Sequence, residues 1–208
     1  MIRAHAFRRL LVLPLAGLAL LAAPAQAQFS QGYKFLEAVK KKDGQKVEDA
    51  INEPGSTIIN TRDVTSGESA LHLVTNRRDL TWMTYLLAKG ANPNLRDSKG
   101  QTPLQLAINL GFVEGVQLLV SRKADINESN DAGETPAISA VHRRDLGMLR
   151  ILLKAGADPD RADNSGRSAR DYALLEGRTS PLLAEIESTA KTREQRAKAA
   201  QGVYGPSF

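Results

Sequence analysis

The chain contains no cysteine among its 208 residues. Without thiols it can form neither a disulfide framework nor a thiolate nucleophile or metal ligand. The same absence excludes a lipid anchor attached to an N-terminal cysteine. The fold must therefore be held together by its packed core, and about 180 residues are enough for one such core.

Histidine is also scarce, with three in the whole chain. Beyond the N-terminal segment only His72 and His142 remain, and their wide separation matches no zinc-binding spacing. A nucleophilic triad needs a base, usually histidine, beside a serine or cysteine, and no such arrangement stands out. The glycines are spaced rather than clustered, so no phosphate-binding loop is present. We therefore predict that the chain is not an enzyme and that it holds no cofactor and no metal.

Only one long apolar run occurs, and it lies near the N-terminus. Arg3, Arg8 and Arg9 precede the run Leu10 to Ala23, and Ala25-Gln26-Ala27 follows it. This layout is typical of a secretory signal peptide, because the run is shorter than the roughly 20 residues of a membrane span. We predict a signal peptide over 1–27, cleavage after Ala27, a periplasmic location and no stable membrane insertion. An uncleaved N-terminal anchor is the alternative.

The basic character of the chain comes partly from this segment. The net charge is +5, and three of the 28 basic residues lie in the predicted signal, which leaves 25 basic against 23 acidic residues. A mature net charge of +2 gives no electrostatic argument for nucleic acid. We predict no nucleic-acid partner.

Glycine recurs at a fixed spacing of 33 residues, at Gly67, Gly100, Gly133 and Gly166. The neighbouring residues recur with it, so the period reflects a repeated structural unit rather than isolated turns. A period in this range is typical of a solenoid, in which copies of one supersecondary unit stack side by side.

Each unit begins with a helix start. Thr102-Pro103 and Thr135-Pro136 place an N-cap threonine before a proline, which needs no hydrogen-bond donor in the first turn. Apolar pairs one period apart then predict a second helix. These pairs are Leu86-Leu87, Leu119-Val120 and Leu152-Leu153.

The second helix should end at a glycine in the left-handed conformation, at Gly90 and Gly156. Lys123 stands at the equivalent position of the unit between them, so we expect that turn to be strained or closed differently.

These units resemble ankyrin repeats of an exported, bacterial periplasmic type, over roughly Lys34 to Ser188. The Gly-x-Thr-Pro-Leu start at Gly100, the paired leucines and the Gly-Ala-Asp-x-Asp segment at Gly156 carry the resemblance. It implies an all-α repeat solenoid of helix pairs joined by β-hairpin fingers. One extra residue before Gly67 should enlarge one finger.

The resemblance divides the chain into a signal peptide (1–27), a repeat domain (28–188) and a flexible C-terminal tail (189–208). Within the domain we place an N-cap unit (31–60), three repeats (61–94, 95–127, 128–160) and a C-cap unit (161–188). The tail carries Tyr204 and Phe208, which give it docking to the array as an alternative to disorder.

The resemblance also implies that His72 ties neighbouring hairpins together, and that binding residues line the concave face of the fingers and first helices. We expect a monomer that binds a protein of unknown identity through this face. A passive envelope or stress-related protein without a dedicated partner is the alternative, and a solvated role is equally open for His142. The predicted partner-binding residues are Arg62, Arg77, Arg96, Lys99, Asn109, Leu110, His142 and Arg143.

Overall fold

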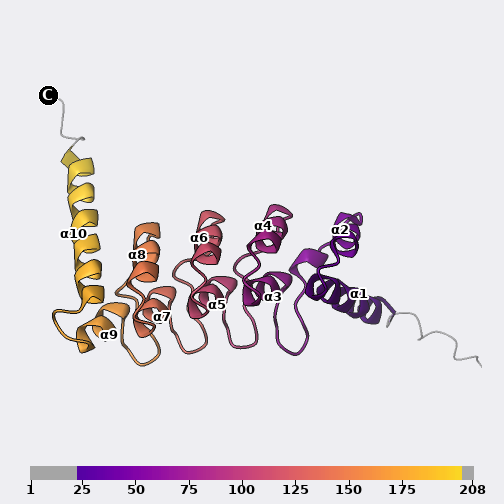
Figure 1. Cartoon of the computed structure of the whole chain (residues 1–208), viewed down its shortest axis with the longest axis horizontal. Helices are drawn as coiled ribbons and strands as arrows, with labels where there is room; N and C mark the ends of the chain where they lie inside the picture. Colours follow the sequence, from indigo (N-terminus) through magenta and orange to yellow (C-terminus); the bar gives the residue numbers. More distant parts are fainter. Residues whose placement is uncertain (1–22, 203–208) are drawn as a thin grey trace, which may run out of the picture.

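The computed structural model describes residues 23–202, and the chain there forms paired helices in a single curved row (Figure 1). The predicted signal falls mostly outside the described residues, as do Tyr204 and Phe208. The helices are α1 (Ala23–Lys40), α2 (Gly44–Asn52), α3 (Ala70–Asn76), α4 (Leu80–Ala88), α5 (Pro103–Asn109), α6 (Val113–Ser121), α7 (Pro136–His142), α8 (Leu146–Ala155), α9 (Ala169–Leu175) and α10 (Pro181–Gly202), with a short 3₁₀ helix η1 (Ile58–Asn60) after α2.

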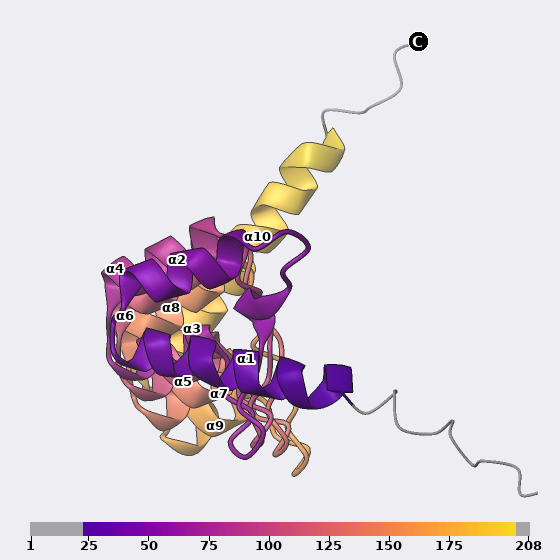
Figure 2. The ribbon, with the colours of Figure 1, turned by 90° about the vertical axis from the view of Figure 1, so that its right-hand side faces the viewer.

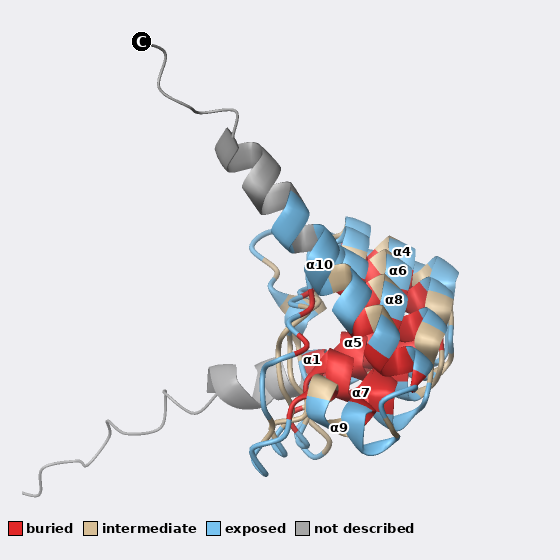
Figure 3. Cartoon of the chain, turned by 90° about the vertical axis from the view of Figure 1, so that its left-hand side faces the viewer, coloured by how far each residue is buried: buried red, intermediate tan, exposed pale blue. Residues whose placement is uncertain are grey.

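The helices form two layers. The odd-numbered helices make an inner row, and the even-numbered helices make an outer row above it (Figure 1). Each inner helix packs against the next inner helix and against its own outer partner. Figure 3 shows the buried residues gathered between the two rows. The expected all-α repeat fold is therefore confirmed for the described part of the chain.

The inner helices begin where their capping residues predict. The hydroxyls of Ser69, Thr102, Thr135 and Ser168 each accept a hydrogen bond from the backbone amide three residues later. This bond satisfies an amide that has no partner inside the helix. The repeated Ser/Thr position therefore sets the start of every inner helix from α3 to α9.

Each inner helix from α3 onward is preceded by a loop that we call a finger. Fingers 1 to 4 span residues 61–69, 95–102, 128–135 and 161–168, and they project from one side of the array (Figure 2). Within residues 23–202 they contain one isolated antiparallel bridge, between Arg62 and Ser69, and no strand. One backbone bond crosses each finger, such as that from the amide of Asp97 to the carbonyl of Gln101 at 2.9 Å, but the expected β-hairpins are not shown.

Finger 1 is larger than the others, as the extra residue predicted. The amide of Gly67 donates to the carbonyl of Asp63, four residues earlier, whereas Gly100 donates to Asp97, three residues earlier. The turn after α6 also meets expectation, because Lys123 takes a φ of 62° in the left-handed region. A side chain in that region costs roughly 1–2 kcal/mol relative to glycine.

The first and last helices of the array each cross a predicted boundary. α1 begins at Ala23, so the predicted cleavage after Ala27 lies inside this helix. α10 continues to Gly202, so most of the predicted flexible tail lies in a helix that extends beyond the outer row (Figure 1). Within residues 23–202 no helix is long and apolar enough to cross a membrane.

Candidate interaction face

His72 joins finger 1 to finger 2. Its Nδ1 atom accepts a hydrogen bond from the amide of Ser69 at 3.2 Å, and its Nε2 atom donates to the carbonyl of Gln101 at 3.0 Å. Burial lowers the pKa of His72, and the bond to Gln101 opposes that shift in part. The buried ring is therefore neutral, and these contacts confirm the role expected for it.

Gln105 makes the same connection one unit later. Its side-chain amide donates to the carbonyl of Glu134 at 2.7 Å, while its oxygen accepts from the amide of Thr102 at 3.2 Å. A glutamine can thus replace the histidine, because both side chains present one donor and one acceptor.

The loops after the outer helices are joined by a second series of contacts. The Oδ1 atoms of Asn60, Asn94 and Asn127 each accept a hydrogen bond from a backbone amide of the next unit at 2.8 Å. At the next position Asp160 instead pairs with Arg170, with Oδ1 and Nε 2.6 Å apart. The series ends there because α10 continues through the position at which a loop amide of the next unit would lie.

Two of the predicted partner-binding arginines, Arg77 and Arg143, bind the last carbonyls of the preceding inner helix. Arg77 donates from Nη1 to the carbonyls of Val39 and Lys40, at 2.8 and 3.0 Å. Arg143 donates from Nη1 to the carbonyl of Asn109 at 2.7 Å. Both therefore cap the C-terminus of the preceding inner helix, whose last carbonyls have no helical partner.

The second arginine of each pair reaches forward instead. Arg78 donates to the carbonyl of Leu110, and Arg144 pairs with Glu176, with Nε and Oε1 2.8 Å apart. Each Arg-Arg pair thus links its own unit to the unit before it and to the unit after it. The 66-residue spacing of the two pairs at equivalent turns is the sequence signal for this role.

Arg62 and Arg96 connect fingers. Arg62 donates to the carbonyl of Arg96 at 2.8 Å, and Arg96 pairs with Glu128 at 2.9 Å and Asp131 at 3.1 Å. Lys99 differs from both, because its exposed side chain makes neither an ion pair nor a hydrogen bond within the described part of the chain. Of these three residues, Lys99 is the one whose charge is unused by the scaffold.

The remaining predicted residues lie along the inner helices. Leu110 is partly buried against the core. The Asn109 side chain is exposed, with no hydrogen bond to any residue in 23–202. His142 lies 3.2 Å from Glu134 through Nδ1, and its ring meets Tyr172 edge-on with centroids 4.4 Å apart. These side chains occur on successive inner helices and form no common pocket.

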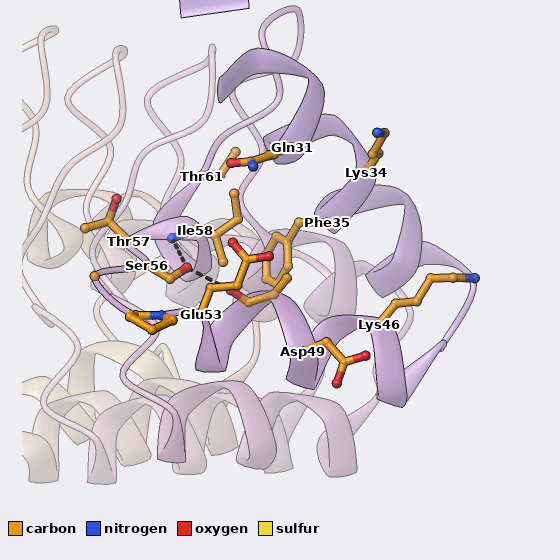
Figure 4. Close-up of a pocket in the computed structure, with 13 residues that line it drawn as sticks. Gln31, Lys34, Phe35, Lys46, Asp49, Glu53, Ser56, Thr57, Ile58 and Thr61 are labelled. Carbon is orange, nitrogen blue, oxygen red and sulfur yellow. Dashed lines mark hydrogen bonds between the residues drawn. The ribbon is translucent and has the colours of Figure 1, made fainter. Parts of the chain in front are cut away.

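One cavity of about 570 Å³ lies in the first unit, between α1, α2 and the loop after α2 (Figure 4). Phe35, Ala50 and Ile58 supply apolar lining. Figure 4 shows Lys34 and Lys46 pointing away from Phe35, and Lys46 pairs with Asp43 at 2.7 Å. No predicted site residue lines this cavity, and its charged groups do not converge.

No group of three or more His, Asp or Glu side chains in residues 23–202 could hold a metal ion. Ser139 donates to Glu134 at 2.8 Å, and His142 bonds the same carboxylate oxygen. His142 is therefore not placed to take a proton from Ser139, as a catalytic base would be.

Comparison with protein families supports the repeat assignment. Residues 35–130 match a family model described as ankyrin repeats in three copies. Residues 119–173 match a second model, described as ankyrin repeats in many copies. The two matches together cover more than half of the chain and agree with the stacked helix pairs, the finger contacts and the 33-residue period. The chain belongs to the ankyrin repeat family.

Proposed function

We propose that this protein is a non-catalytic interaction module that binds a protein partner through its inner face. By inner face we mean the fingers together with the exposed sides of α3, α5, α7 and α9. Ankyrin repeats generally mediate protein–protein interaction, which supports a protein as the ligand. The main support for a binding surface here is that the Lys99 and Asn109 side chains are exposed on this face and make no contact that holds the array together.

Fewer of the predicted partner-binding residues remain available to a partner once those that hold neighbouring units together are set aside. Arg77 and Arg143 hold backbone carbonyls, and Arg96 is paired with two carboxylates. Lys99, Asn109 and His142 keep polar atoms that a partner could reach. Polar side chains that fold the array and polar side chains that bind a partner are thus separate groups in this proposal.

We propose that binding takes place in the periplasm, after removal of residues 1–27. The basic, apolar and small-residue segments at the N-terminus support export. Cleavage after Ala27 would leave Gln28 as the first residue and would keep the greater part of α1. N-terminal sequencing of the cell-derived protein tests this, and a protein that still starts at Met1 contradicts it.

The binding proposal is tested by affinity capture from the periplasmic fraction of the native host, with the doubly substituted Lys99→Glu/Asn109→Glu protein. Both side chains are exposed and make no scaffold contact, so folding should be unaffected. We expect recovery of the partner to fall about tenfold, the loss that one central interface contact produces.

Gln117→Glu is the matched control, because Gln117 is exposed on α6 in the outer row. It should recover the same partner as the unsubstituted protein. Equal recovery with all three proteins would show that the inner face is not the binding surface.

A further inference from the structure

The turn between α5 and α6 differs in sequence from the turns on either side of it. Residues 76–79, between α3 and α4, are Asn-Arg-Arg-Asp, and residues 142–145, between α7 and α8, are His-Arg-Arg-Asp. Residues 109–112 are instead Asn-Leu-Gly-Phe. Figure 2 shows the turns between paired helices on the side of the array away from the fingers. The middle turn on this side therefore lacks both the arginines and the aspartate of its neighbours.

Arginines from both neighbouring units reach the end of α5. Arg78, in the preceding unit, donates to the carbonyl of Leu110. Arg143, in the following unit, donates from Nη1 to the carbonyl of Asn109 at 2.7 Å. Because these carbonyls belong to consecutive residues, both guanidinium groups lie at the end of one helix. The Arg143 group also lies beside Gly111, where an added Cβ atom would be 3.0 Å from Nη2.

The positive charge at this end of α5 is not neutralised by the scaffold. Neither Arg78 nor Arg143 makes an ion pair within residues 23–202, and Glu114 in the first turn of α6 pairs with neither. The carbonyls at a helix end carry only about half a negative charge together, against two full positive charges. Each guanidinium has five N–H donors, and a bond to one carbonyl leaves the others unused.

Neighbouring turns show which group is missing here. Asp79, the N-cap of α4, lies 2.7 Å from Nζ of Lys42 in the preceding unit. Arg144 reaches forward to Glu176 at 2.8 Å. Cations that extend to these turns thus meet a carboxylate. Phe112 takes the N-cap position in α6, where it is buried and its side chain makes no capping hydrogen bond, so the turn after α5 offers no carboxylate of its own.

We propose that Arg78 and Arg143 bind carboxylate groups of an acidic segment of the protein partner. The segment supplies the negative charge that Asp79 provides one unit earlier. Guanidinium groups suit this task, because each can donate two parallel hydrogen bonds to one carboxylate. The contact lies at the helix turns and is additional to the inner face. This inference rests on the proposed function, because it gives the chemistry of the protein partner at a second contact.

Fluorescein-labelled hexaglutamate is the probe, and its fluorescence anisotropy in low-salt buffer measures binding to the whole chain. The Arg78→Gln/Arg143→Gln variant should bind it about tenfold more weakly, because two cations are lost. A glutamine amide can still donate to the carbonyls of α5, and circular dichroism checks that the fold is retained. Failure of the unsubstituted protein to bind hexaglutamate would overturn the inference.

The matched control is Arg122→Gln/Arg178→Gln, which removes the same net charge. Both arginines are exposed, and their side chains make no contact within the described ranges. This control should change the affinity for hexaglutamate less than about twofold. Equal weakening in the two double variants would mean that only the overall charge of the protein attracts the peptide, and it would overturn the site.

A second pair of variants leaves both arginines in place. Gly111→Asp puts a carboxylate beside Arg143, and Gly111→Asn puts an uncharged group of nearly the same size there. Position 111 tolerates a side chain, since Arg78 and Arg144 at the equivalent positions both have a φ of 53°. Hexaglutamate should bind about tenfold more weakly to the Asp variant than to the Asn variant. Equal affinities would contradict the proposal.

Capture from the periplasmic fraction separates this inference from the proposed function. A partner recovered in full with Arg78→Gln/Arg143→Gln, but lost with Lys99→Glu/Asn109→Glu, would overturn the arginine site and leave the inner face standing. Loss with the arginine variant alone would support the arginine site and contradict the inner face. Full recovery with both variants would overturn both.

Discussion

The periodic glycines differ in why a side chain is excluded at each position. Gly67 has a φ of +70°, which side chains rarely adopt, and a Cβ atom added there would lie 2.6 Å from the amide nitrogen of Ser98. Gly166 has a φ of +80°, and an added Cβ would meet nothing within 4 Å. The first glycine is thus required by conformation and by stacking, and the last by conformation alone.

We expect Gly67→Ala to cost more stability than Gly166→Ala. Both changes carry the roughly 1–2 kcal/mol penalty for a side chain in the left-handed region. Gly67→Ala should lose about 1 kcal/mol or more in addition, because fingers 1 and 2 must move apart. Urea unfolding of the two variants measures the difference, and equal losses would show that the contact between these fingers is not tight.

At the scale of the element, the start of α3 depends on one uncharged ring. His72 accepts from the Ser69 amide through Nδ1, so protonation would place two donors face to face at this cap. Asp97 and Glu68 favour the charged ring and Arg62 opposes it, but burial has the largest effect and lowers the pKa. The cap and the contact to finger 2 are therefore sensitive to acid.

The unfolding free energy should fall as the pH is lowered below about 6.5, the pKa of an unfolded histidine. In that range the unfolded chain binds a proton that the folded chain does not, so the slope is at most about 1.4 kcal/mol per pH unit. The variant His72→Gln should lose this part of the slope, because Gln105 already makes the same contacts without titrating.

Urea unfolding of both proteins between pH 7 and pH 5 measures the effect, above the range in which most carboxylates titrate. The two proteins differ only at position 72, so the difference between their slopes reports on His72. Identical slopes for the two would exclude His72 as the source of the acid sensitivity.

The two arginine pairs show what the repeat register leaves undetermined. Their position at the end of an inner helix is visible in the sequence, and the concave face of related arrays favours a binding role. The structure adds that Arg77 and Arg143 cap the preceding inner helix. Repeat register places a residue on a unit, but it does not give the direction of a long side chain, which depends on distances between units.

At the scale of the whole molecule, the inner helices within the array are each covered by the next repeat, whereas part of the last inner helix, α9, is exposed to solvent. Val141 on α7 is 2% exposed beneath the next unit, and Leu174, at the same register on α9, is 48% exposed. The same position is therefore core within the array and surface at its C-terminal end, because each repeat buries the one before it.

Val141→Asn should destabilise the protein by about 3 kcal/mol, from lost apolar burial and a polar group left without partners. Leu174→Asn should cost less than about 1 kcal/mol, since water already reaches that position. Thermal unfolding of the two variants provides the comparison. A large loss for Leu174→Asn would mean that a further element covers the end of the array in solution.

The sequence by itself determined the number and order of the helix pairs, the capping residues and the enlarged first finger, whereas the role of His72 followed from the family resemblance. These features are local or strictly periodic, so each can be recognised from neighbours along the chain. The tertiary structure decided that α10 continues to Gly202. It also decided which arginines hold neighbouring units together, because those contacts depend on the spacing between units.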